Sequence, residues 1–125
     1  MAKSLTKLVA CLALAAAPAL AGDAAKEIGT AANHAGLAAG AQDPQMVKSH
    51  LHHVLNCLEG PGGADFAAVA GNPCQDMGAG AIGDSAPDRR ASLEKAVTLA
   101  KEGLAELDAI KAKALAAQVQ AILGK

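Results

Sequence analysis

The sequence predicts an all-α fold, a four-helix bundle built from two helical hairpins, and three observations support this prediction. Apolar residues recur three and four positions apart in four segments of the chain, which is the spacing of one face of an α-helix. Short polar residues that favour helix N-termini precede these segments. Glycine and proline concentrate in one stretch, residues 60–86, which separates the first pair of helices from the second.

The first 21 residues have the pattern of a signal peptide, which would be removed from the bundle. Lys3 and Lys7 give a positively charged n-region. Residues 8–17 form an apolar run that is too short to span a bilayer about 30 Å thick. Ala19-Leu20-Ala21 fits a cleavage site, so we expect cleavage after Ala21 and export to the periplasm or the medium. A lipoprotein signal is the alternative, because Leu8-Val9-Ala10-Cys11 resembles a lipobox.

Residues 22–41 are predicted to form the first helix, with Asp23 as its N-cap. The buried face expected from the spacing is Ile28, Ala32, Ala35 and Ala39. His34 lies off this stripe, either as a half-exposed surface histidine or as a ligand reaching toward the second helix. Because the link to the next helix is very short, we expect the two helices to fold back as a hairpin.

The second helix, residues 43–59, holds the most informative pattern in the chain. Asp43 is a suitable N-cap and Pro44 a suitable first residue. One stripe of this helix is apolar and is expected to be buried: Val47, Leu51, Val54 and Leu58. The neighbouring stripe carries possible metal ligands: Met46, His50, His53 and Cys57.

Residues 60–86 are predicted to form an irregular loop. A loop of this length in a small domain usually has a function or is fixed to the rest of the domain. We expect a short helical turn at residues 65–70, with Phe66 closing one end of the bundle. No lysine follows the glycines as a phosphate loop requires, and the alternating acidic residues of an EF-hand are missing.

Residues 87–107 and 108–123 are predicted to form the second hairpin. Ser85 and Asp88 have the spacing of a capping box around Pro87, and Asp108 can cap the last helix. Two apolar stripes change phase near Ile110: Leu93, Val97, Ala100, Leu104 and Leu107, then Leu115, Val119 and Ile122. One long bent helix is the alternative.

The composition of residues 22–125 indicates a single domain with a thin core. The segment has 9 basic and 12 acidic residues, no basic patch, and one aromatic residue besides histidine, which argues against nucleic-acid binding. Alanine buries little apolar area, so a cross-link or a ligand would stabilise the fold. Cys57 and Cys74 are the cysteines that remain after cleavage, and a pair in an exported protein most often forms a disulfide. That bond would tie the loop to the second helix.

The histidines of the second helix favour a transition-metal site. His50 and His53 lie one turn apart, so both imidazoles can reach one ion, and nitrogen ligands suit zinc and copper. Met46 adds a thioether, which favours copper, and His34 can complete the set if the first helix packs alongside. Cys57 cannot be both a thiolate ligand and half of a disulfide, and we favour the disulfide.

With its signal peptide, its four short helices and the sequence His50-Leu51-His52-His53, the chain resembles small exported histidine-bearing helix-bundle proteins that bind copper and other divalent metals. The resemblance implies metal binding outside the cytoplasm. Those proteins carry many more histidines, spread over several helices. Here three of the four histidines share one turn, which argues against high-capacity storage and leaves one or two sites.

Other functions have less support in the sequence. The main alternative is a disulfide-stabilised helical interaction module with no metal or catalytic role, whose protein partner is unknown. The absence of Cys-x-x-Cys-His excludes c-type haem, and a b-type haem would lack a ligand on the last helix. No Ser-His-Asp pattern or cofactor motif indicates an enzyme.

Overall fold

The computed structural model describes residues 22–125, and within that range the chain is helical and has no strand. Four long helices are present: α1 (Ala24–Gly40), α2 (Pro44–Glu59), α4 (Pro87–Ala105) and α5 (Ala109–Leu123). A single-turn helix, α3 (Ala81–Asp84), brings the number of α-helices to five, one more than predicted. The predicted signal peptide lies outside the described residues. Within 22–125, no helix is both long and apolar enough to cross a membrane.

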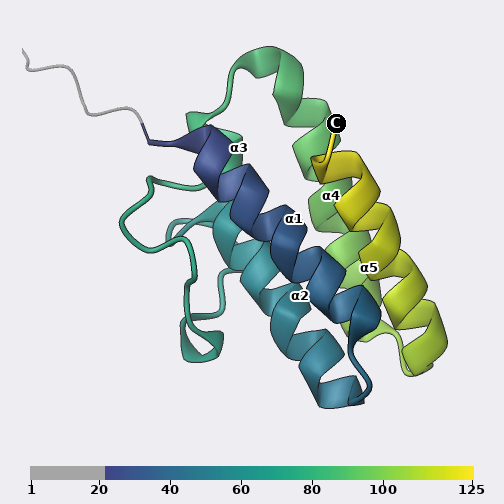
Figure 1. Cartoon of the computed structure of the whole chain (residues 1–125). Helices are drawn as coiled ribbons and strands as arrows, with labels where there is room; N and C mark the ends of the chain where they lie inside the picture. Colours follow the sequence, from purple (N-terminus) through teal and green to yellow (C-terminus); the bar gives the residue numbers. More distant parts are fainter. Residues whose placement is uncertain (1–21) are drawn as a thin grey trace, which may run out of the picture.

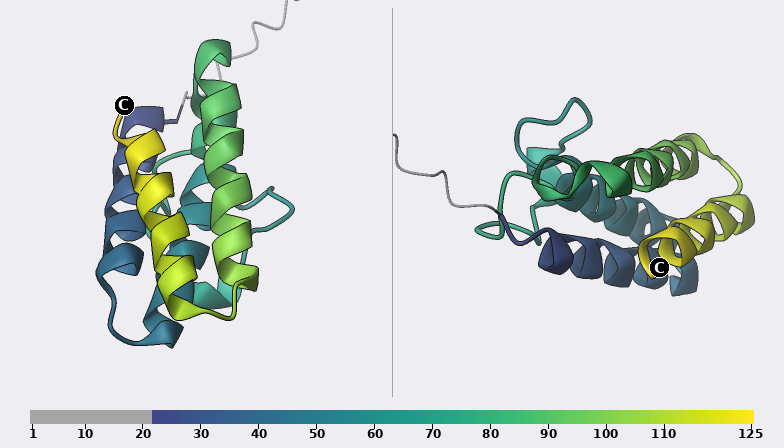
Figure 2. Two further views of the ribbon diagram at one scale, coloured as in Figure 1. Left: turned by 90° about the vertical axis from the view of Figure 1, so that its right-hand side faces the viewer. Right: turned by 90° about the horizontal axis from the view of Figure 1, so that it is seen from above.

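The long helices form two antiparallel hairpins that pack around one core (Figure 1). Helix α1 packs mainly against α2 and α5, while α4 packs mainly against α5 and α2, and α2 and α5 also touch. Figure 2 shows the second hairpin lying alongside the first, with the irregular segment 60–80 outside α2. The loop therefore covers one side of the first hairpin.

The predicted N-caps of three long helices are confirmed. Asp23, Asp43 and Asp108 each accept a hydrogen bond from a backbone N–H in the first turn of their helix. The predicted capping box is wrong, because Ala86 occupies the N-cap of α4 and makes no side-chain bond. Ser85 instead ends α3, since its N–H donates to the Ala81 carbonyl.

Burial confirms the prediction for α2 and corrects the one for α1. The apolar stripe of α2 is fully buried: Val47, Leu51, Val54, Leu55 and Leu58. On α1 the buried alanines are Ala31, Ala35 and Ala38, whereas Ile28, Ala32 and Ala39 are only partly buried. Because α1 lies between α2 and α5, its buried face is turned from the predicted stripe. His34 shares this turned face, since it lies three residues after Ala31 and four before Ala38.

The second hairpin consists of two helices, as predicted. Leu93, Val97 and Ala100 of α4 are buried, but Leu107 is 93% exposed, so its predicted place in the core is wrong. Helix α4 ends at Ala105, and Leu107 belongs to the short connection before Asp108. On α5, Val119 is buried as predicted. Leu115 and Ile122 are only half-buried, because Ala112, Ala116 and Leu123 supply the rest of the buried face.

The irregular segment is fastened to the end of α2. The predicted disulfide between Cys57 and Cys74 is present. Gly60 and Gly80 have φ values of +69° and +114°, and a Cβ on Gly60 would lie 1.8 Å from the Ala79 carbonyl oxygen, so glycine permits this close crossing of the backbone. The short helical turn is a 3-10 turn, η1 (Ala68–Ala70). Phe66 is only half-buried and lies outside the core, so its predicted plugging role is wrong.

Candidate metal centre

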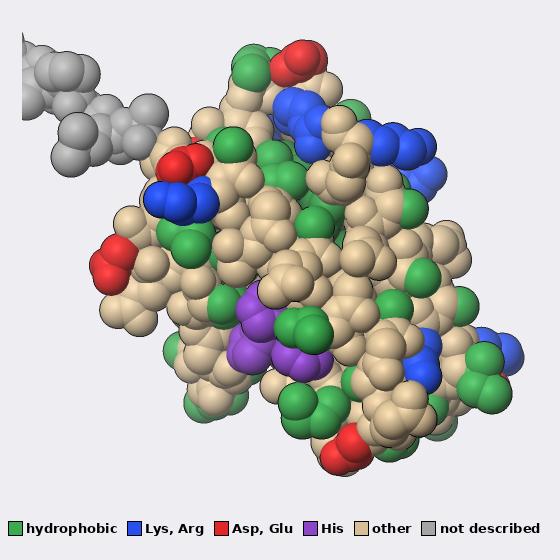
Figure 3. Space-filling model, viewed as in Figure 1, with side chains coloured by type: hydrophobic (Ala, Val, Ile, Leu, Met, Phe, Trp, Pro, Cys, Tyr) green, Lys and Arg blue, Asp and Glu red, His purple; other side chains and the backbone are tan. Residues whose placement is uncertain are grey.

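Three histidines from two helices converge on one point. His34 comes from α1, and His50 and His53 come from α2. The Nδ1 atom of His34 lies 3.0 Å from His50 Nδ1 and 3.4 Å from His53 Nδ1. One ligand atom from each ring lies within 4.8 Å of those from the other two. Figure 3 shows the histidine side chains as one patch on the face formed by α1 and α2. We call these three residues the histidine triad.

The packing of the first hairpin explains this convergence. His50 and His53 lie three residues apart on α2 and therefore share a face. The small side chains of Ala31, Ala35 and Ala38, all buried, let α1 approach closely enough for His34 to reach that face. The three side chains are half-buried, so they are partly sheltered but remain open to solvent on one side. The sequence placed His34 at the second helix only as one of two alternatives.

The environment of His34 and His50 favours the neutral imidazole. Burial, followed by the neighbouring His53 and His50, lowers the pKa of His34 to about 4. Burial, followed by His53, also lowers the pKa of His50. Both rings are therefore uncharged at neutral pH. A neutral imidazole carries a nitrogen lone pair, which is the form that binds a metal ion.

A backbone carbonyl of the loop fixes the orientation of His53. His53 Nε2 lies 2.6 Å from the Ala70 carbonyl oxygen, which can only accept a hydrogen bond, so the proton of the neutral ring is on Nε2. The lone pair of the ring then lies on Nδ1, the nitrogen that faces His34. Metal-bound histidines commonly donate their other ring N–H to a carbonyl in this way.

Asn56 holds the segment that supplies this carbonyl. Its side chain is fully buried, donates to the carbonyls of Ala67 and Gly71, and accepts from the Ala67 N–H. Ala70 therefore lies on a short stretch fastened at both ends. Sequence reasoning missed Asn56, although one signal was available: it is the only polar residue in the run from Val54 to Leu58.

The distances within the triad suit a single transition-metal ion. Two nitrogens bound at 2.0–2.1 Å to a tetrahedral ion lie about 3.3 Å apart, close to both measured Nδ1 separations. His34 Nδ1 lies within 3.4 Å of both other Nδ1 atoms, so any hydrogen on it would have to leave before an ion could bind there. The triad supplies three nitrogen ligands and leaves a fourth position for water or another ligand.

The two sulfur residues of the predicted ligand stripe differ in their availability. Cys57 is bonded to Cys74, so its sulfur is not a thiolate and cannot serve as a ligand. Met46 is 46% exposed, and it lines a groove of about 500 Å³ together with Leu37 and His50. Met46 thus lies beside the triad and outside it, with its side chain half-exposed.

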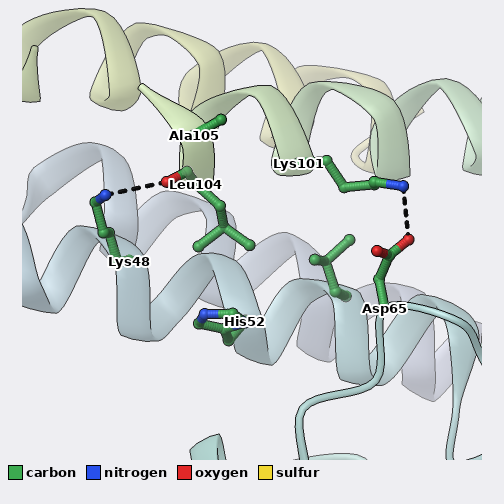
Figure 4. A pocket seen from close by; sticks show the side chains of 7 residues that line it. Lys48, His52, Asp65, Lys101, Leu104 and Ala105 are labelled. Carbon is green, nitrogen blue, oxygen red and sulfur yellow. Dashed lines mark hydrogen bonds and ion pairs between the residues drawn. The ribbon is translucent and has the colours of Figure 1, made fainter. Parts of the chain in front are cut away.

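The fourth histidine does not join the triad. His52 lines a different groove of about 500 Å³, between α2 and α4 (Figure 4). In that groove Lys48 Nζ donates to the Leu104 carbonyl, and Lys101 forms an ion pair with Asp65 at 2.8 Å. Because both lysines are engaged, the groove offers no free cation to a ligand.

The geometry defines a three-histidine centre on the first hairpin, supported by a loop that a disulfide and a buried asparagine hold in place. The comparisons add no family or activity to this description. Neither protein-family models nor curated proteins nor solved structures give a match to this chain.

Proposed function

We propose that this protein binds one transition-metal ion of the copper or zinc class through His34, His50 and His53, outside the cytoplasm and after cleavage near Ala21. The observation that carries the proposal is the approach of His34 Nδ1 to the Nδ1 atoms of both other rings, at 3.0 and 3.4 Å. The lowered pKa of His34 and the Nε2 proton of His53 support it, because they leave ligand lone pairs available. The proposal includes no catalytic step.

Met46 bears on the choice between copper and zinc. A thioether binds cuprous copper well and zinc poorly. Met46 lies one turn before His50 and shares its groove, so a rotation of this flexible side chain can bring the sulfur toward the fourth position. We therefore expect Met46→Leu to weaken cuprous binding and to leave zinc binding unchanged.

The experiment is a competition titration of the metal-free protein with zinc and with cuprous copper against a chromophoric chelator. Alanine at His34, His50 or His53 should each lower affinity by about 100-fold, because each ligand of a structural zinc site is worth on the order of 3 kcal/mol. His52→Ala is the matched control, since it removes a histidine from the same turn and leaves the triad intact. Equal affinities for His52→Ala and His53→Ala would refute the proposal.

An interaction module without a metal is the second candidate. Val69, in the 3-10 turn η1 of the tethered loop, is fully exposed and offers an apolar side chain to a partner. A protein of this kind would keep the same melting temperature with and without added metal. Metal binding predicts a rise instead, by mass action on the folded state.

A further inference from the structure

The side chains of Glu27 and Asp84 lie together beside Gly22, at the start of α1, and we call this cluster the acidic pocket. Glu27 is 1% exposed, and its Oε1 accepts a hydrogen bond from the Gly80 N–H. Its Oε2 is buried and has no hydrogen-bond partner among residues 22–125. The neighbouring Asp84 carboxylate accepts from the Ala79 N–H. The pocket therefore holds two carboxyl groups with one oxygen unpartnered.

Gly22 is in contact with this pocket. A Cβ built on Gly22 would lie 1.9 Å from Asp84 Oδ2 and 2.8 Å from the Gly78 Cα, so only glycine fits there. The backbone nitrogen of Gly22 and this built Cβ share the Cα of Gly22, so by standard dimensions the nitrogen lies at most about 4.5 Å from Asp84 Oδ2. A hydrogen bond from the Asp23 N–H to the Met77 carbonyl fixes the backbone next to Gly22.

We propose that cleavage after Ala21 completes this pocket, because the new α-ammonium group of Gly22 pairs with the carboxylates of Asp84 and Glu27. Hydrolysis of the Ala21–Gly22 peptide bond by a signal peptidase consumes one water. It leaves a carboxylate on Ala21 and an amino group on Gly22, which is protonated at neutral pH. The peptide nitrogen of the uncleaved chain has no charge to offer. The pocket is thus a binding site for the amino terminus of the processed chain.

The other charged side chains near the acidic pocket do not supply a positive charge to its carboxylates. Asp23, Glu27 and Asp84 are the acidic groups that act on it. Lys26, on the first turn of α1, pairs with Asp23 at 3.8 Å and is largely exposed. Burial, then the like charge of Asp84 and a side-chain hydrogen bond with Asp84, raise the pKa of Glu27, while the hydrogen bond from the Gly80 N–H lowers it. The inference depends on export and is independent of metal binding.

The test uses metal-free protein exported from the full-length gene. Mass spectrometry should identify Gly22 as the amino terminus, and the backbone ¹³C resonances of Gly22 should then be followed with pH. We expect an α-amino pKa about one unit or more above its ordinary 7.7–8.0, as for other groups that have an opposite charge within about 4–6 Å. Asp84→Asn should return the pKa toward the ordinary value. Asp88→Asn, an exposed carboxylate at the start of α4, should not.

Two results would overturn the inference. One is an amino terminus other than Gly22 in the exported protein. The other is an α-amino pKa of the wild-type chain inside the ordinary range, which can be read without any variant. Neither result depends on the histidines, so the metal proposal and this one fail separately.

Discussion

The two hairpins of this protein are made of similar residues and have different roles. All four histidines lie on the first hairpin, and so do both buried polar side chains within residues 22–125, Glu27 and Asn56. The second hairpin has only apolar side chains and Gly103 in its buried face. Yet each hairpin supplies about half of the walls around the common core.

This difference shows that the buried polar interactions of the fold are concentrated on the first hairpin. A buried polar group is costly unless it is hydrogen-bonded, so each one requires a partner in a fixed place. On the first hairpin the loop 60–80 supplies these partners, through the backbone groups of Ala67, Gly71 and Gly80. The loop touches the second hairpin only at its surface, through the ion pair of Asp65 with Lys101, and the buried face of that hairpin packs through apolar contacts. Stability should therefore depend on both hairpins, and metal affinity on the first.

The largest expected change in stability comes from the second hairpin. Leu93 of α4 is fully buried, so Leu93→Ala should lower the free energy of unfolding by about 3 kcal/mol, through lost burial and the cavity left behind. Metal affinity should stay unchanged, because α4 supplies no ligand to the triad. Denaturant unfolding and the chelator competition measure the two effects. A loss of metal affinity in Leu93→Ala would mean that the metal centre also depends on the second hairpin.

Asn56→Ala should have an intermediate effect on stability and a distinct effect on the metal centre. Loss of its three hydrogen bonds should cost about 2 kcal/mol. The Ala70 carbonyl would lose its fixed position, so His53 would no longer be held as the Nε2–H tautomer. We expect metal affinity to fall by 10- to 100-fold, the usual range of about one to two orders for such outer contacts. Long-range ¹H–¹⁵N spectra of the metal-free protein report the tautomer directly.

Glu59→Ala is the matched control for this prediction. Glu59 also holds the loop to α2, through a hydrogen bond from the Asp65 N–H, but it acts on a stretch that does not contact the triad. Its loss should loosen the loop and leave the His53 tautomer and the metal affinity unchanged. If both variants weaken metal binding equally, general loosening of the loop explains the effect and Asn56 has no specific role.

The smallest expected change concerns Glu27 and depends on pH. The folded-state pKa of Glu27 is raised, chiefly by burial, above the ordinary 4.5, so the folded chain holds this proton more tightly than the unfolded chain. Its contribution to stability is therefore complete below pH 4.5 and is lost as the pH rises through the raised value. This applies to a chain in which the Gly22 nitrogen is an amide, either the precursor or an N-acetylated form starting at Gly22.

Glu27→Gln tests this contribution. Glutamine keeps the oxygen that accepts from Gly80, and its NH₂ group can donate to Asp84. At neutral pH the variant should be more stable by about 1 kcal/mol, the low end for satisfying a buried polar atom. Denaturant unfolding of both chains between about pH 4 and pH 8 gives the comparison. Burial also raises the pKa of Glu59, so both chains should show a further, smaller loss of stability as the pH rises. Parallel curves for the two chains would contradict the prediction.

The sequence predicted the helices well where local chemistry decides the outcome. Asp23, Asp43 and Asp108 mark three helix starts because a short carboxylate satisfies free backbone N–H groups. The buried stripe of α2 was readable because leucine and valine alternate there with polar residues. On α1 the choice between neighbouring stripes of alanine has almost no signal in hydrophobicity, so packing against α2 and α5 determined which face is buried.

The metal centre was predictable only in part, for the same reason. Two histidines one turn apart on one helix could be identified from spacing alone. The position of His34 depends on the rotation of α1, which the alanine pattern leaves undetermined. Asn56 and Ala70 act through contacts between α2 and the loop, and the spacing of residues along the chain carries no information about such contacts.

The origin of the triad in two helices has a consequence for how the chain would respond to metal supply. His34 is separated from its partners by the bend at residues 41–43, so a captured ion would act as a clip across that bend. The molecule would then have two cross-links, the disulfide and a metal ion that can be removed. Protease cutting at the bend, slow in the clipped form and faster in the open form, would turn metal availability into a difference in protein lifetime.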